Sequence, residues 1–112
     1  GAYQFTPLKE IFEKQVVETL ETRIILAENV EDNLYKLPKQ VTNKLMVWQK
    51  QVMFLGIREV RKIKGYHDEP LHGDRKEQRS FRLNKAYRGF YITNKDGKVE
   101  IVKVIDVNKH KY

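Results

Sequence analysis

The sequence predicts an α+β domain in which an αα-hairpin packs on one face of a small antiparallel or mixed sheet, preceded by one further helix. Three observations carry this prediction. Apolar residues recur at helical spacing in the first half of the chain, and strand-like segments with tight turns fill most of the second half. A polar connector containing Gly and Pro separates them, and the 112 residues suffice for one core but not for two.

Residues 1–21 are predicted to form an amphipathic helical extension, and residues 22–112 the main domain. Thr6 can cap this helix, and Pro7 suits its first position because Pro lacks the N–H that would stay unpaired there. The apolar stripe consists of Leu8, Ile11, Phe12, Val16 and Leu20, and the other face is mostly acidic. Such a stripe must be buried against the main domain or against a partner.

The main domain opens with a predicted strand over residues 23–27, followed by two helices. Asn29 is expected to cap a short helix that Pro38 ends. A second helix is predicted from apolar residues at regular helical spacing, namely Val41, Leu45, Trp48, Val52 and Leu55. Gly56 is expected to stop it, and the two helices form an αα-hairpin.

A connector over residues 65–78 leads into three predicted antiparallel strands. Residues 79–83 and 86–93 read as strands joined by a tight turn, and Asp96-Gly97 is a strong hairpin signal. Residues 99–107 carry apolar side chains on both faces, which is typical of a central strand covered on both sides. A polar tail ends the chain.

The charge distribution predicts a polyanionic partner. Residues 1–34 hold three basic and seven acidic side chains, whereas the remainder holds 19 basic and 8 acidic ones, so the net charge of +7 conceals a strongly basic second part. Nucleic acid is the first candidate, and a merely well-solvated basic surface is the alternative. With no cysteine, no apolar leader and no run long enough to span a bilayer, we expect a cytoplasmic protein without membrane association.

The ionisable groups around the connector suggest cleavage of RNA without a metal or cofactor. That chemistry needs a base for the 2′-hydroxyl, cations for the phosphate and an acid for the leaving oxygen. The candidate acids and bases are Glu69, His67 and His110; the candidate phosphate ligands are Arg79, Arg82 and Arg88, with further RNA contacts from Lys64, His67 and Lys109. Two of the arginines occupy strand positions that alternate with the apolar positions, so we expect their side chains to share one face of the sheet. Tyr87, Tyr91 and Tyr112 could stack on bases.

Each of these features also has a purely structural interpretation. A histidine in a loop is most often solvated, and Arg79 and Arg82 could form surface salt bridges with Glu77 or Asp74. The alternating tyrosines could be packing residues. His67 and His72 match no familiar metal-ligand spacing, so no metal site is predicted. The residues by themselves indicate a nucleic-acid-binding domain and only suggest a nuclease.

Two segments resemble the RelE/ParE superfamily of toxins from bacterial type II toxin–antitoxin systems, with HigB- and YoeB-like members the most similar. They are a Pro-Leu-x-Gly-Asp-Arg run at residues 70–75 followed by Tyr-Arg-x-x-Tyr at residues 87–91, and a His-containing end over residues 104–112. The resemblance implies a RelE-like fold and a ribosome-dependent mRNA endonuclease. Because no metal-bound water is evident, the expected product carries a 2′,3′-cyclic phosphate. The resemblance also implies a cognate antitoxin that neutralises the toxin.

The resemblance assigns roles to individual positions. It makes Glu69 the general base, Arg88 the ligand of the scissile phosphate, His110 the general acid and Tyr112 the terminal aromatic residue; Arg82 falls where RelE has a strand lysine. Lys111 separates His110 from Tyr112, whereas the YoeB-like ending has the two residues side by side. HigB-like members have a histidine where this chain has Glu69.

Two other functions stay open. One is a ParE-type toxin that binds and inhibits a DNA topoisomerase without catalysing a reaction, and the other is a plain RNA-binding module. The acidic helical extension at residues 1–21 could cover the core, or it could fold over the sheet and restrain activity as an antitoxin would.

Overall fold

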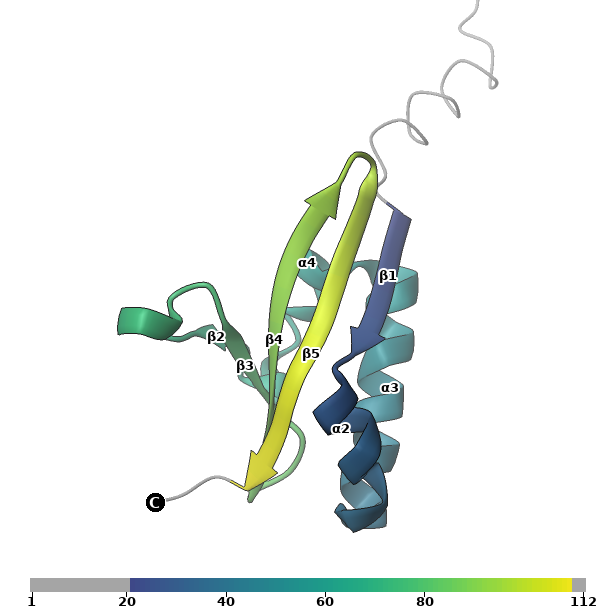
Figure 1. The fold of residues 1–112 in the computed structure, drawn as a ribbon, viewed down its shortest axis with the longest axis vertical. Coiled ribbons are helices and arrows are strands. Elements are labelled where there is room, and N and C mark those ends of the chain that lie inside the picture. The colour runs from purple at the N-terminus through teal and green to yellow at the C-terminus, as the bar shows by residue number, and fades with distance from the viewer. Residues whose placement is uncertain (1–20, 110–112) are drawn as a thin grey trace, which may run out of the picture.

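The computed structural model describes residues 21–109, which form a layer of helices packed on one face of a mixed sheet (Figure 1). The strands are β1 (Glu21–Leu26), β2 (Glu69–Pro70), β3 (Arg79–Arg82), β4 (Tyr87–Asp96) and β5 (Val99–Lys109). The helices are α2 (Glu28–Asn33), α3 (Lys39–Leu55) and α4 (Ile57–Val60), with 3₁₀ turns at Leu34–Lys36, Lys64–Tyr66 and Gly73–Arg75. The predicted extension lies outside the described residues, except for Glu21.

The strand order is β1-β5-β4-β3-β2, so β5 has a neighbour on each side and is an interior strand, as predicted. Strand β1 runs parallel to β5, with Glu21 opposite Val99 and Leu26 opposite Val104, and the other neighbours are antiparallel. The α+β architecture with a mixed sheet and an αα-hairpin on one face is therefore confirmed. The described helices lie on one face only, and the predicted cover over the second face of β5 is not seen within residues 21–109.

A β-bulge in β5 decides which of its side chains reach the core. Phe90 opposes Asp106 while the next residue, Tyr91, opposes Val104, so Ile105 is an extra residue in the ladder. A bulge shifts the alternation of side chains by one position. Val104 and Val107 consequently both contact the core on the helix side although they are three residues apart.

Helix α3 provides much of the apolar layer, and it follows the predicted pattern with one exception. Val41, Leu45, Trp48 and Val52 are buried, but Leu55 is 54% exposed because the helix ends there and the chain turns away at Gly56. Gly56 has a φ of 82°, a conformation that glycine adopts without strain. The chain then forms α4, which the sequence analysis did not predict.

The predicted cap of the first short helix was wrong. Ala27 occupies the N-cap position of α2, and Asn29 lies inside the helix. The Asn29 side chain instead donates a hydrogen bond of 3.1 Å to the carbonyl oxygen of Ile105. A side-chain contact to the sheet has therefore taken the place of a local cap.

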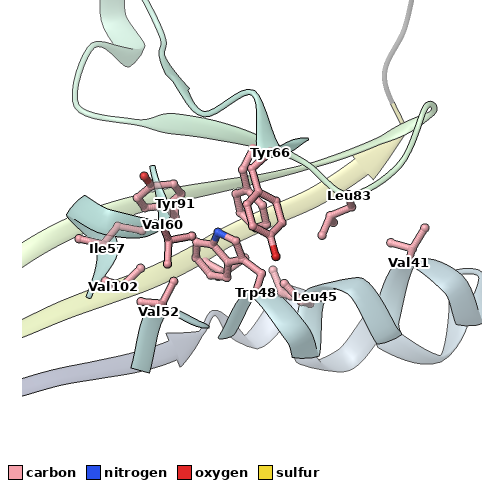
Figure 2. Packing of buried hydrophobic residues seen from close by; sticks show 13 residues of the cluster. Val41, Leu45, Trp48, Val52, Ile57, Val60, Tyr66, Leu83, Tyr91 and Val102 are labelled. Carbon is pink, nitrogen blue, oxygen red and sulfur yellow. The ribbon is translucent and has the colours of Figure 1, made fainter. Parts of the chain in front are cut away.

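Aromatic stacking joins α3 to the sheet. The Trp48 and Phe81 rings are stacked with centroids 4.0 Å apart, and the Tyr91 and Tyr66 rings meet Phe81 edge-on. Figure 2 shows Trp48 rising from α3 between Tyr91 and Tyr66. Such contacts add to the stabilisation from burial, because aromatic edges and faces carry opposite partial charges.

Gly89 sits directly beneath this stack, and we predict that Gly89→Ala destabilises the fold. A Cβ atom at this position would collide with the Phe81 ring, which Trp48 holds from its other side. The expected loss in the free energy of unfolding is about 1–3 kcal/mol, measured by urea denaturation.

The control is Gly65→Ala, where a Cβ atom would meet open space. Its effect should stay within about 0.5 kcal/mol. Equal effects of the two substitutions would show that the close approach at Gly89 is unimportant.

Candidate active site

Strand pairing gathers polar residues on the face of the sheet that points away from the aromatic core. Ser80 opposes Glu69 on β2 and Phe90 on β4, and Arg82 opposes Arg88. Because side chains alternate along a strand, these five residues share one face, here called the arginine face. The prediction that two arginines lie on one face is confirmed for Arg82 and Arg88.

Arg88 is held in place on the arginine face by two hydrogen bonds. Its Nη2 donates to Ser80 Oγ at 2.9 Å and to the backbone oxygen of His67 at 3.0 Å. Among residues 21–109, no hydrogen bond uses its Nε or Nη1. A guanidinium fixed in this way is suited to phosphate oxygens, which match its fork of donors.

Glu69 lies beside this guanidinium and is open to solvent. Its Oε1 is 3.8 Å from Arg88 Nη2, and its side chain is 67% exposed, compared with 16% for Arg88. The loose ion pair leaves the carboxylate free to accept a proton from another group. The predicted base and the predicted phosphate ligand are therefore neighbours in the structure, although they are 19 positions apart in the sequence.

His67 contributes its backbone to this arrangement. It ends the 3₁₀ turn Lys64–Tyr66 in the left-handed conformation, with a φ of 43° and a ψ of 49°, which is uncommon outside glycine. This conformation turns its carbonyl oxygen to Arg88 Nη2. The His67 side chain is exposed, and its predicted contact with RNA stays a prediction.

Asp68 anchors the connector from the other side of the sheet. Its side chain is only 1% exposed; Oδ1 accepts a hydrogen bond of 2.6 Å from Arg79 Nε, and Oδ2 accepts one of 2.6 Å from the Tyr91 hydroxyl. Tyr91 in turn accepts a 3.0 Å bond from Arg61 Nε. These four residues, here called the Asp68 network, fix the backbone between His67 and Glu69.

The Asp68 network changes the pKa values of its members. Burial first, and then the hydrogen bond to Asp68, raise the pKa of the Tyr91 hydroxyl, and Arg61 offsets part of this increase. Burial alone would lower the pKa of Arg79, but the hydrogen bond and charge of Asp68 outweigh it and the pKa is raised. Both groups therefore keep their protons firmly, as a permanent structural network requires.

The structure separates Arg79 from the other two candidate phosphate ligands. Arg79 opposes Pro70 and Tyr91, which places it on the sheet face opposite Arg82 and Arg88. Arg79 pairs with Asp68. The alternative interpretation from the sequence expected a surface salt bridge with Glu77 or Asp74. The sequence analysis missed Asp68, because its partners Arg79 and Tyr91 lie 11 and 23 residues further along the chain.

The remaining described candidates are exposed. Lys64 is exposed in its 3₁₀ turn, and Lys109 is exposed at the end of β5 opposite Tyr87. Arg75, which the sequence analysis did not select, places its guanidinium carbon 5.0 Å from the centre of the Phe90 ring. His110 and Tyr112 lie outside the described residues.

Two of the three tyrosines proposed to stack on bases have packing roles. Tyr91 is fully buried and belongs to the aromatic core, and Tyr87 is half-buried against it. Within residues 21–109 no three His, Asp or Glu side chains gather to hold a metal ion. No helix in this part of the chain is both long and apolar enough to cross a membrane.

We predict that Asp68→Asn weakens the fold by about 2–3 kcal/mol. Removing one charge of a buried pair leaves its partner uncompensated, and the loss is moderated here because Arg79 is 26% exposed. Urea denaturation would measure it. Asp74→Asn, an exposed carboxylate in the same connector, is the control and should change stability by less than about 0.5 kcal/mol. Equal stabilities for the two variants would contradict this role of Asp68.

The raised pKa of Tyr91 predicts a loss of stability in alkaline solution. Because the folded chain holds this proton more tightly than the unfolded one, the contribution is complete below the ordinary pKa of 10.0 and declines above it. The free energy of unfolding of the unaltered chain should therefore fall between about pH 8 and about pH 11 by about 1 kcal/mol more than that of Tyr91→Phe. Equal declines in denaturant titrations would exclude this linkage.

The fold of this chain is similar to folds seen in solved structures. No protein-family model matches the chain, and no curated protein matches its sequence. Solved structures do match, among them a YoeB/ParE toxin from Agrobacterium tumefaciens with a TM-score of 0.58 and 18% identity, covering 80% of this chain and 99% of that one. The E. coli DinJ–YafQ toxin–antitoxin complex gives a TM-score of 0.63 at 15% identity, with coverage of 81% and 94%.

A third similar structure is the YoeB–YefM complex from Staphylococcus aureus, with a TM-score of 0.59, 20% identity and coverage of 80% and 98%. These matches extend over almost the whole length of the known chains, and identities this low establish the fold alone. The chain therefore has the fold of the RelE/ParE-type bacterial toxins, as the resemblance in residues 70–75, 87–91 and 104–112 predicts.

Proposed function

We propose that the protein is the toxin of a type II toxin–antitoxin system and acts as a ribosome-dependent mRNA endonuclease without a metal ion. The observation that carries this proposal is Glu69 beside the anchored Arg88 on one exposed face. A carboxylate within reach of a fixed guanidinium supplies two of the three groups that RNA cleavage needs. The toxin fold supports the same conclusion.

In the proposed reaction, Glu69 removes the proton of a 2′-hydroxyl group, and the resulting oxygen attacks the adjacent phosphorus. The bond from phosphorus to the 5′-oxygen breaks, which leaves a 2′,3′-cyclic phosphate and a new 5′-hydroxyl. The exposure of Glu69 suits this role, because the hydroxyl must come within about 3 Å of the carboxylate. No further reactant is required.

Arg88 would bind the phosphate that is attacked, and Arg82 would add a second guanidinium beside it. Negative charge gathers on the phosphate oxygens during the reaction, and preorganised donors stabilise it more strongly than mobile ones. Lys64, His67 and Lys109 would contact neighbouring parts of the RNA. Arg79 is the weakest candidate for such a contact, because Asp68 already binds its guanidinium.

His110 would protonate the leaving 5′-oxygen, and Tyr112 would orient the substrate or stack on a base. The strand register supports this assignment, because Asn108 opposes Arg88 and His110 is two positions further along the chain. His110 therefore follows in the chain just beyond the partner of the phosphate ligand.

The proposed partners follow from the same surface. An open face with little enclosure needs help in positioning mRNA, and the ribosome would provide it. The +7 net charge favours association with such a polyanion. A cognate antitoxin in the cytoplasm would neutralise the toxin by covering this face.

We predict that Glu69→Gln and Arg88→Ala each reduce cleavage of mRNA by about 10²–10⁴-fold, and that His110→Ala does so as well. The measurement is primer extension on mRNA from a cell-free translation reaction, with and without ribosomes. Glu77→Gln is the matched control, because it removes an exposed carboxylate from the same connector. It should leave cleavage unchanged.

Undiminished cleavage in the Glu69 and Arg88 variants would contradict the assignment of the active site. Uncut mRNA with translation unimpaired would overturn the endonuclease proposal for this chain. Inhibition of a purified topoisomerase would then identify a ParE-type toxin, and RNA binding without either activity would identify a binding module.

A further inference from the structure

A pocket of about 540 Å³ lies on the helix-covered side of the sheet, between α3 and the turn that joins β3 to β4. Its polar lining consists of Gln40, Asn43, Lys44, Arg82, Asn84 and Lys85. Three of these side chains are cationic and three are amides, and no residue of 21–109 contributes a carboxylate to the lining. Its volume falls within the range of roughly 300–1,000 Å³ that is typical of ligand pockets.

Arg82 connects the pocket to the proposed active site. It lines the pocket and is also the strand partner of Arg88. Strand β2 pairs only with Arg79 and Ser80, so within residues 21–109 it does not extend along the edge of β3 as far as Arg82. An extended ligand bound at Arg88 therefore reaches the pocket by passing around the edge of β3 at Arg82, which β2 leaves uncovered.

Local contacts hold two of the lining side chains in place. Lys44 Nζ lies 4.9 Å from the centre of the Tyr66 ring, and Tyr66 is itself buried and hydrogen-bonded to Gln51. Asn84 Oδ1 accepts bonds of 2.8 Å from the backbone N–H groups of Ala86 and Tyr87, which fixes the turn. Both groups are thus positioned without a ligand.

The other two amides are available for recognition. Gln40 and Asn43 lie one turn apart on α3, and their side chains take part in no hydrogen bond within residues 21–109. An amide offers both a donor and an acceptor, which suits the edge of a base. Val47 and Leu83 also line the pocket and provide an apolar surface for the ring of that base.

We propose that this pocket binds one nucleotide of a single-stranded RNA next to the phosphate held by Arg88. Lys44, Arg82 and Lys85 contact its phosphate, and Gln40 and Asn43 contact its base. This assignment rests on the proposed function and adds a second binding site to it. It also gives the toxin a means of favouring certain nucleotides beside the scissile bond.

The test measures binding of a fluorescent 2′-O-methyl oligonucleotide, which lacks the attacking hydroxyl and stays intact. Fluorescence anisotropy at several salt concentrations gives both the affinity and its dependence on salt. Lys44→Ala should weaken binding by about tenfold and reduce the salt slope by about 0.7. The double variant Gln40→Ala/Asn43→Ala should weaken binding by about fivefold without altering the slope.

Lys50→Ala is the matched control, because it removes the same charge from another part of the same helix and does not line the pocket. Its affinity should change by less than about twofold. Thermal unfolding checks that every variant is folded. Equal losses in Lys44→Ala and Lys50→Ala, with no loss in the amide variant, would overturn the pocket site and leave only general attraction to a basic surface.

Cleavage assays on the same proteins separate this proposal from the proposed function. RNA binding that depends on the pocket, in a chain that cuts no mRNA, would support the pocket and reject the endonuclease. Cleavage that depends on Glu69 and Arg88, with affinities unaffected by the pocket variants, would support the endonuclease and reject the pocket. A chain that binds no oligonucleotide at all would also reject the pocket.

Discussion

The buried ion pair between Asp68 and Arg79 is the interaction on which the candidate site depends. The connector has little regular structure of its own, since β2 contains only two residues, and such a segment is otherwise free to move. Asp68 ties it to Arg79 on β3 and to Tyr91 on β4. The residues on either side of Asp68 are thereby held against Arg88 on the opposite face of the sheet.

The alternation of side chains along β4 couples the candidate site to the aromatic core. Arg88 and Gly89 are consecutive on β4, and their positions point to opposite faces of the sheet. Gly89 gives Phe81 room to stack on Trp48, while Arg88 binds Ser80 and the His67 carbonyl. Close packing on one side thus fixes the strand that carries the proposed phosphate ligand on the other.

The arginines around the candidate site form two groups, one on each face of the sheet. Arg79 and Arg61 belong to the Asp68 network and are occupied by protein partners. Arg88 and Arg82 lie on the arginine face, and Arg82 also lines a pocket to which no described residue contributes a carboxylate. A positive surface next to an exposed Glu69 combines attraction for a polyanion with a group that can accept a proton.

The sequence by itself determined the elements whose signals are local. The spacing of Val41, Leu45, Trp48 and Val52 gave α3, Asp96-Gly97 gave the β4–β5 hairpin, and strand alternation put Arg82 and Arg88 on one face. The resemblance in the connector and the β4 motif correctly indicated the toxin fold. Helical and strand periods are properties of neighbouring residues, so they can be read without the tertiary structure.

Only the tertiary structure decided the features that depend on residues distant in the sequence. The parallel pairing of β1 with β5, the bulge at Ile105, the exposure of Leu55 and the contact of Asn29 with Ile105 all arise from packing between elements. The role of Asp68 is of the same kind, because its partners lie 11 and 23 residues away. A carboxylate in a polar run looks the same in the sequence whether it is solvated or buried, and only the folded sheet brings Arg79 and Tyr91 to it.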